Sequence, residues 1–154
     1  MRLVVDTNII FSALLKKNSK ALEIIMRDDV EIFIPKFLVI EIFKHKERII
    51  KVSKLSEDEV LESFYLLLKY CTILDDEDIP GQIFDQALQY VKETDPKDVV
   101  FVAAAISLDA QLWTGDIKLI NCLKVKNINI PRQTKEVLSH IKWVSLLLYS
   151  PIFQ

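Results

Sequence analysis

The segment DPKDVVFVAAAISLDAQLWTGDIKLI, residues 95–120, decides the fold class. Asp95-Pro96 is a helix-start signal, and the apolar residues after it predict a helix that continues to Leu108. Residues 111–114 are typical of a short buried strand, and another helix is expected from Ile117. Such close succession of helix, strand and helix indicates an α/β protein.

The rest of the chain repeats this alternation. Further strands are predicted at residues 3–5, 32–34, 71–74 and 128–130. Further helices are predicted at residues 9–17, 19–27, 36–52, 56–68 and 82–91, and after Pro131. We therefore expect a three-layer sandwich, with a central, mostly parallel sheet of about four to five strands flanked by helices. A length of 154 residues with 51% hydrophobic residues suits a single domain over residues 1–154.

Composition excludes several kinds of site. Two cysteines without CxxC spacing and only two histidines cannot supply the usual structural zinc ligands, so any metal must be held by oxygen. Two glycines cannot build a phosphate-cradling P-loop or a dinucleotide fingerprint. No run approaches the ~18 apolar residues of a membrane span, and the start lacks a leader pattern, so we expect a cytoplasmic protein with no membrane contact.

Charge is unevenly distributed along the chain. Residues 35–54 carry a net charge of +4 and residues 55–98 of −9, although the whole chain has only −2. Such segregation can steer a polyanion to one face. Solvated helix faces produce the same pattern without any ligand, so both interpretations stay open.

Three acidic residues stand at element boundaries. Asp6 and Asp116 follow predicted strands, and ligands of open parallel sheets gather at the carboxyl ends of the strands. Each could instead cap the helix that follows it, and Gly115 would permit a sharp turn before Asp116. Asp98 lies where an acid favours a helix N-terminus. Individually, capping explains all three.

Glu41 is harder to explain as a surface residue. It interrupts the apolar run FLVIEIF of residues 37–43 within a predicted helix. An ionised carboxylate in such surroundings needs a partner or a metal. Lys44 and His45, three and four residues later, could form an ordinary ion pair with it. Ion pair and metal ligand therefore remain equal alternatives.

The four acids together predict a metal site. Two strand ends, a helix interior and a helix start can converge at one edge of an α/β sheet, where clustered acids repel one another unless cations intervene. Oxygen ligands select Mg²⁺ or Mn²⁺. Such ions activate water and neutralise charge on a phosphate, so a nuclease would need no serine, cysteine or histidine nucleophile.

These motifs resemble those of the PIN domain, a fold shared by many metal-dependent ribonucleases, including the toxins of VapBC-type toxin–antitoxin pairs. VVDTNIIFSALL at residues 4–15 is similar to the family's first motif and IPKFLVIEI at residues 34–42 to its second. The segment 95–120 contains the third and fourth, and the resemblance spans residues 3 to about 124.

The resemblance implies roles for individual residues. Metal-binding, catalytic roles fall on the four acids Asp6, Glu41, Asp98 and Asp116. Asn8 and Thr114 would support these ligands or orient a phosphate, and the alanines at 103–105 would let their helix approach the sheet closely. Many relatives carry another acid shortly after the fourth motif, where this chain has Lys118, so the number of bound ions stays open.

The function expected from the resemblance is a metal-dependent endoribonuclease, either an antitoxin-bound toxin or a processing enzyme. Lysines and an arginine near the acids could contact the RNA backbone without selecting sequence: Lys36, Lys44, Lys46, Arg48, Lys51, Lys54 and Lys118. A non-catalytic RNA-binding or scaffold protein of the same fold is the alternative, although such a protein would normally have lost one of the acids. A receiver-type protein with an aspartate nucleophile is a third class, but no D-x-D pattern follows Asp6.

The segment 143–154 forms an apolar C-terminal tail beyond the resemblance. It is too short to span a bilayer and too hydrophobic to be one exposed patch. It either packs on its own domain or covers a partner, most simply a second copy in a two-fold homodimer, an arrangement that PIN-domain proteins often adopt.

Overall fold

A central parallel sheet organises the fold. The structure, a computed structural model, describes the backbone of residues 1–148 and the side chains of residues 1–142. Within this part, one sheet has the order β3-β2-β1-β4-β5, and all neighbouring strands run parallel. The strands are β1 (Arg2–Val5), β2 (Glu31–Pro35), β3 (Cys71–Leu74), β4 (Gln111–Trp113) and β5 (Pro131–Arg132).

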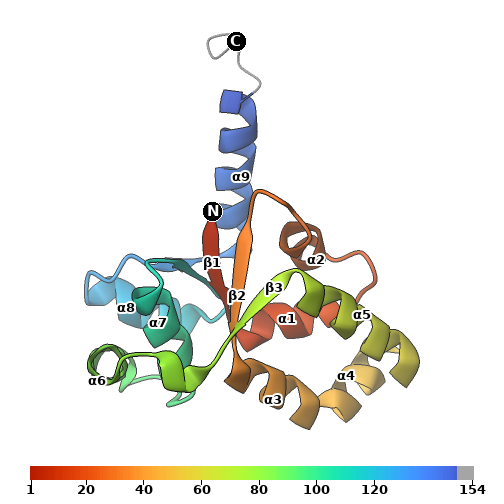
Figure 1. Cartoon of the computed structure of the whole chain (residues 1–154), viewed down its shortest axis with the longest axis horizontal. Helices are drawn as coiled ribbons and strands as arrows, with labels where there is room; N and C mark the ends of the chain where they lie inside the picture. Colours follow the sequence, from red (N-terminus) through yellow and green to blue (C-terminus); the bar gives the residue numbers. More distant parts are fainter. Residues whose placement is uncertain (149–154) are drawn as a thin grey trace.

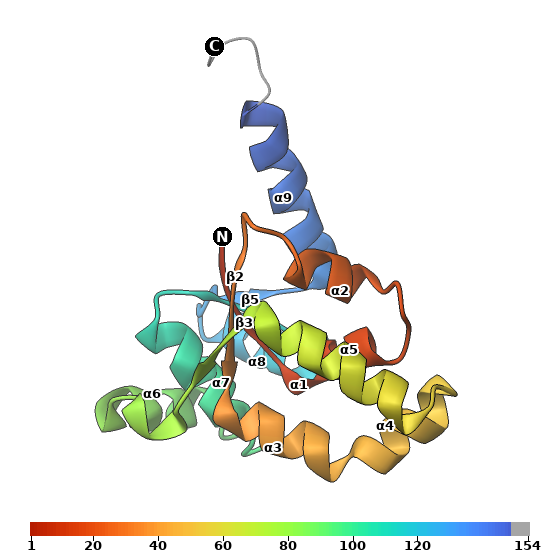
Figure 2. The ribbon, with the colours of Figure 1, turned by 45° about the vertical axis from the view of Figure 1, so that its right-hand side comes forward.

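Helices cover both faces of this sheet, which confirms the three-layer prediction. Helices α6, α7 and α8 lie on one side, whereas α1, α2 and α5 lie on the other (Figures 1 and 2). The helices of the described part are α1 (Thr7–Leu14), α2 (Lys20–Ile25), α3 (Lys36–Lys44), α4 (Lys46–Ser53), α5 (Glu57–Lys69), α6 (Gly81–Val91), α7 (Asp98–Ser107), α8 (Ile117–Val125) and α9 (Thr134–Leu148), with a short 3₁₀ helix at Asp76–Asp78.

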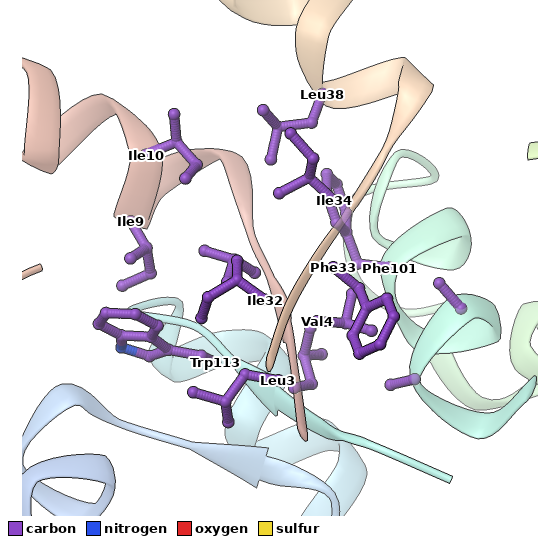
Figure 3. Packing of buried hydrophobic residues seen from close by; sticks show 14 of the residues in the cluster. Leu3, Val4, Ile9, Ile10, Ile32, Phe33, Ile34, Leu38, Phe101 and Trp113 are labelled. Atoms are coloured by element: carbon purple, nitrogen blue, oxygen red, sulfur yellow. The ribbon is translucent and has the colours of Figure 1, made fainter. Parts of the chain in front are cut away.

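The core forms around β1, the central strand. Leu3, Val4 and Val5 are completely buried, as expected for a parallel strand covered on both faces. Trp113 of β4 is also completely buried, and Figure 3 shows it near Leu3 among side chains from both sheet and helices. The alanines at 103–105 are fully buried in α7, which contacts β1, β2 and β4. Small side chains therefore occur where this helix meets the sheet.

The strand order reverses between β1 and β4. The chain proceeds from β1 outward through β2 and β3, and then returns to the other side of β1 to form β4 and β5. The Asp6 backbone N–H donates to the Trp113 carbonyl at 3.0 Å, which extends the β1–β4 pairing to the carboxyl ends of both strands. Asp6 and Asp116 therefore flank the point where open α/β sheets usually bind ligands.

Helix caps are partly local and partly remote. The Ser19 hydroxyl accepts from Leu22 N–H, and Ser56 forms a complete capping box with Glu59, as their sequence spacing predicted. Helix α3 is capped from far away, because Asp76 Oδ2 accepts the Phe37 N–H at 3.0 Å. This bond fixes the loop after β3 against the start of α3.

The predicted single helix over residues 36–52 is wrong. It breaks at His45, whose φ of −103° and ψ of 11° separate α3 from α4. Neither proline nor glycine causes the break. Both helices pack on α1, but α3 also packs on β2 and α4 on α5, so the contacts of the chain change across the break.

Two predicted boundaries also differ from the structure. The last strand lies at Pro131–Arg132 rather than at residues 128–130, with Ile130 O accepting from Leu112 N. Because β5 is an edge strand, the backbone N–H that Pro131 lacks is not needed for a hydrogen bond within the sheet. The helix expected from Asp95-Pro96 begins at Asp98, because residues 95–97 form a turn closed by the Asp98 N–H bond to Asp95 O.

The C-terminal prediction falls largely beyond the described side chains. Helix α9 projects from the end of the sheet (Figures 1 and 2), and its backbone includes residues 143–148. Residues 149–154, and the side chains of 143–148, lie outside the described part, so the two alternatives for this tail stay open. None of the described helices combines the length and apolarity needed to cross a membrane.

The connection from β4 to α8 does not use the conformational freedom that Gly115 offers for a sharp turn. Neither glycine has a positive φ, and a Cβ added at Gly115 would meet no atom within 4 Å. Gly115→Ala should therefore keep the fold and stabilise it by about 0.4–1 kcal/mol, because alanine reduces the entropy of the unfolded chain. Urea unfolding of both proteins measures this difference, and a loss of more than about 1 kcal/mol would contradict it.

Candidate metal centre

Asp6 lies at the end of β1, where it is nearly completely buried. Its side chain forms no capping bond to α1; instead Oδ2 accepts a 2.6 Å hydrogen bond from the Thr114 hydroxyl. Burial raises the Asp6 pKa above its usual value, and the nearby Asp116 charge adds to the rise, while the Thr114 bond opposes it. The backbone N–H groups of Asn8 and Thr7 also oppose the rise, so the start of α1 favours the ionised carboxylate although no capping hydrogen bond forms, and burial has the largest effect on this acid.

Asp116 follows β4 and caps α8. Its Oδ1 accepts from the backbone N–H groups of Lys118 at 2.8 Å and Leu119 at 3.1 Å. Its own N–H donates to the Thr114 hydroxyl oxygen at 3.0 Å, so the completely buried Thr114 links Asp116 to Asp6. Asp116 is thus a cap, and both cap bonds use the same carboxylate oxygen.

Asp98 is the first residue of α7 and is 9% exposed. Its Oδ2 accepts the Asp95 N–H at 3.2 Å, which closes the turn before the helix. Burial, reinforced by the charges of Asp6, Asp116 and Asp95, raises the Asp98 pKa to about 6. The carboxyl group therefore experiences the other acids as well as supporting its helix.

Glu41 lies on α3 with only 10% of its side chain exposed. Lys97 Nζ lies 3.2 Å from its Oε2, and His45 Nε2 lies 4.0 Å from the same oxygen. Within the described residues 1–142, Glu41 therefore has two basic partners. His45 is one of the two partners that helical spacing predicted. Lys97 was not indicated by that spacing. Lys44, the other expected partner, is not paired with it.

All four acids line one cavity of about 270 Å³. The remaining lining residues are a fifth acid, Asp95, and polar, basic and aromatic residues: Thr7, Asn8, His45, Arg48, Lys97, Phe11, Phe37 and Phe101. Thus four separate elements, β1, α3, α7 and the β4–α8 connection, supply the predicted acids to one place. Asn8 also lines the cavity. Thr114 is not among the lining residues, and instead forms hydrogen bonds with Asp6 and Asp116.

The family follows from comparison with known proteins. A family model described as PIN domain matches residues 4–141, which is most of the chain. The chain belongs to the PIN-domain family. No curated protein sequence matches it significantly.

Solved structures show the same PIN fold. A structure of VapBC2 from Rickettsia felis bound to a DNA fragment from their promoter contains a similar chain, with a TM-score of 0.65 and 17% identity over 86% of this chain and 98% of that chain. VapBC-1 from nontypeable Haemophilus influenzae gives a TM-score of 0.61 and 15% identity over 88% of this chain and 99% of that chain. At these identities the likeness concerns the fold.

The donor set in this PIN domain fits a hard divalent cation. Its four carboxylates offer only oxygen ligands, and the raised pKa values of Asp6 and Asp98 reflect burial and charge repulsion that a cation would relieve. In residues 1–142, however, no three acid, histidine or cysteine side chains are already gathered as a metal cluster. Metal binding would therefore require the side chains to adjust, notably Glu41, which is held by Lys97.

Of the basic residues predicted to contact RNA, the structure places Arg48 in the cavity lining, with its guanidinium 5.5 Å from the centre of the Phe11 ring. Lys46 instead pairs with Glu57 at 2.9 Å. Lys44 and Lys118 are not among the residues that line the cavity.

Sequence analysis did not single out Lys97, which lines the cavity and pairs with Glu41. One signal was available, because a lysine beside the first residue of a helix opposes the helix dipole. Lys97 directly precedes Asp98, the first residue of α7. A residue in an unfavourable electrostatic position points to a compensating acid, here Glu41.

The raised pKa of Asp98 predicts a pH-dependent stability in metal-free protein. Because the folded-state pKa is about 6 against an ordinary 3.8, the favourable contribution is complete below pH 3.8 and is lost as pH rises through 6. Asp98→Asn, which cannot ionise, should thus exceed wild type by ~1–2 kcal/mol at pH 7.5, after allowance for solvent in the cavity. The difference should shrink toward pH 4.5.

Urea unfolding in EDTA at both pH values measures this effect. Asp85→Asn, on the exposed side of α6, is the matched control and should show no such trend. Equal loss of stability at both pH values in Asp98→Asn would mean that the side chain acts only as a helix cap.

Proposed function

We propose that this PIN-domain protein is an endoribonuclease that depends on Mg²⁺ or Mn²⁺. The observation that carries the proposal is the convergence of Asp6, Glu41, Asp98 and Asp116 on one cavity that also contains basic side chains. Membership of the family supports nuclease activity in general.

Each of the cavity residues would have a separate role. The four carboxylates hold the cation, and the Thr114 hydroxyl orients Asp6 through its 2.6 Å bond. Arg48 and His45 face the same cavity and would hold the RNA phosphates, with Asn8 able to donate from its amide. When bound, the divalent ion would supply water activation and neutralisation of phosphate charge.

Cleavage assays test this proposal directly. The purified chain should cleave end-labelled single-stranded RNA in Mn²⁺ or Mg²⁺ and stop on addition of EDTA. Asp6→Asn and Asp116→Asn should each reduce cleavage at least ~100-fold, because one missing ligand weakens ion binding and charge stabilisation. Gel electrophoresis of the RNA products measures the rates.

Controls separate this activity from contamination and from unfolding. Asp85→Asn, purified in the same way, should cleave at the wild-type rate, and thermal melts should show that both site variants are folded. Cleavage that survives complete chelation, or an Asp6→Asn protein with full activity, would refute the metal mechanism. RNA binding without cleavage under all metal conditions would support the alternative of a non-catalytic RNA-binding protein.

We also propose that the chain is the toxin of a pair with an antitoxin protein. The two similar structures are of VapBC2, bound to promoter DNA, and of VapBC-1, and this supports a protein partner. A small reading frame just upstream that encodes a DNA-binding protein would strengthen the toxin role. Its absence would favour an RNA-processing role for the same cavity.

We propose a homodimer that forms through the C-terminal segment 143–154, which is rich in apolar residues and begins within α9, the helix that projects from the sheet (Figure 1). Truncation after Lys142 should convert a dimer into a folded monomer, since two-fold dimers depend on such self-complementary surfaces. Light scattering measures the mass and thermal melting the folding. A monomeric full-length chain, or an unstable truncated chain of unchanged mass, would show that the tail belongs to its own core.

A further inference from the structure

Lys97 lies at the boundary of two cavities. Its ammonium is 3.2 Å from Glu41 in the acidic cavity, while the side chain as a whole is 55% exposed. Lys97 also lines a neighbouring apolar cavity of about 350 Å³, together with Phe37, Phe84, Pro96, Val99, Val100 and Asp76. Phe37 and Lys97 are shared by both linings, so the two cavities adjoin at these residues.

The Glu41–Lys97 pair has a clear electrostatic reason. Glu41 is nearly buried, and a buried carboxylate without a nearby cation is strongly unfavourable. His45, at 4.0 Å, is a weaker partner for the same oxygen. Lys97 therefore supplies the main positive charge to Glu41 while no divalent ion is bound.

A divalent cation and Lys97 would compete for Glu41. An ammonium that already holds one carboxylate lowers the negative potential of the cavity and occupies one of its donors. The lysine can move away at little cost, because its stem is flexible and half of the side chain is in solvent. The Glu41 carboxylate, by contrast, has little room to move, because it is nearly buried on α3.

We propose that Lys97 is a positioning residue with two partners: Glu41 in the metal-free protein, and a phosphate of single-stranded RNA once a divalent ion has replaced it. This inference rests on the proposed nuclease function and deepens it. A strand leaving the acidic cavity toward the apolar cavity passes the residue that lines both. Phe37 and Phe84 offer a base an aromatic surface there, and the freed ammonium meets the phosphate backbone beside them.

Because Lys97 has two proposed partners, Glu41 and an RNA phosphate, its substitution should change Mn²⁺ affinity and RNA affinity in opposite directions. Lys97→Met removes the competitor for Glu41, so Mn²⁺ should bind about three- to tenfold more tightly in the absence of RNA. The same change removes a phosphate contact, so RNA should bind about three- to tenfold more weakly in the presence of a divalent ion. A residue with a purely structural role would not improve one affinity and weaken the other.

Calorimetric titration of the full chain with MnCl₂ tests the first effect. Lys124→Met, an exposed lysine on α8, is the matched charge control and should bind Mn²⁺ like wild type. In a Glu41→Gln background, Lys97→Met should no longer change Mn²⁺ affinity, because the residue acts through Glu41. Unchanged or weaker Mn²⁺ binding by Lys97→Met, or a full effect without Glu41, overturns the inference.

Fluorescence anisotropy with labelled single-stranded RNA in Ca²⁺ tests the second effect, with a gel to show that the RNA stays intact. Lys97→Met should also reduce the slope of log affinity against log salt by about one, whereas Lys97→Arg should restore both values. Equal RNA affinity and salt slope in Lys97→Met and wild type overturn the phosphate contact.

These measurements distinguish the inference from the proposed function. Wild-type protein that binds Mn²⁺ and RNA, with Lys97→Met identical to it, removes only the role of Lys97. Wild-type protein that binds neither Mn²⁺ nor RNA contradicts the nuclease proposal and, with it, this inference. Thermal melts of every variant show that the compared proteins are folded.

Discussion

The hydrogen bond from the Thr114 hydroxyl to Asp6 holds together the two strand ends on which the acidic cavity is built. It lies at the reversal of strand order between β1 and β4, in a completely buried position. The same hydroxyl oxygen accepts the Asp116 N–H, so one side chain sets the spacing of two acids. Both acids closely follow strands of the sheet and both are bonded to Thr114, so the sheet sets where their backbones lie relative to each other.

The cavity contains buried acidic side chains and basic side chains that lie beside them. Asp6 and Asp98 have raised pKa values, a sign that their ionised forms are disfavoured. Glu41 is instead compensated by Lys97. Burial of the acids in this site therefore has two different consequences: the pKa values of Asp6 and Asp98 are raised, whereas Glu41 has a cation beside it.

Sequence patterns predicted the elements whose causes are local. The apolar runs of β1 to β4 and the capping box at Ser56 depend on neighbouring residues, and the resemblance identified the four acids that the structure brings to one cavity. Contacts between distant segments could not be predicted in this way. The Glu41–Lys97 pair joins residues 56 apart, and the break at His45 lies where the contacts of the chain change from β2 to α5. Helical spacing suggested Lys44 as a partner of Glu41. It could not suggest Lys97, because spacing within one helix contains no information about the start of α7.

The cap that Asp76 provides to α3 restricts how this protein can vary. Surface loops ordinarily accept insertions and deletions among homologues. The loop after β3 differs, because Asp76 in its 3₁₀ turn accepts the Phe37 N–H at the start of the helix that carries Glu41. A change in loop length would release that helix end and alter the depth at which Glu41 enters the cavity. Natural variation in this acidic loop should therefore conserve its length more strictly than its exposed side chains.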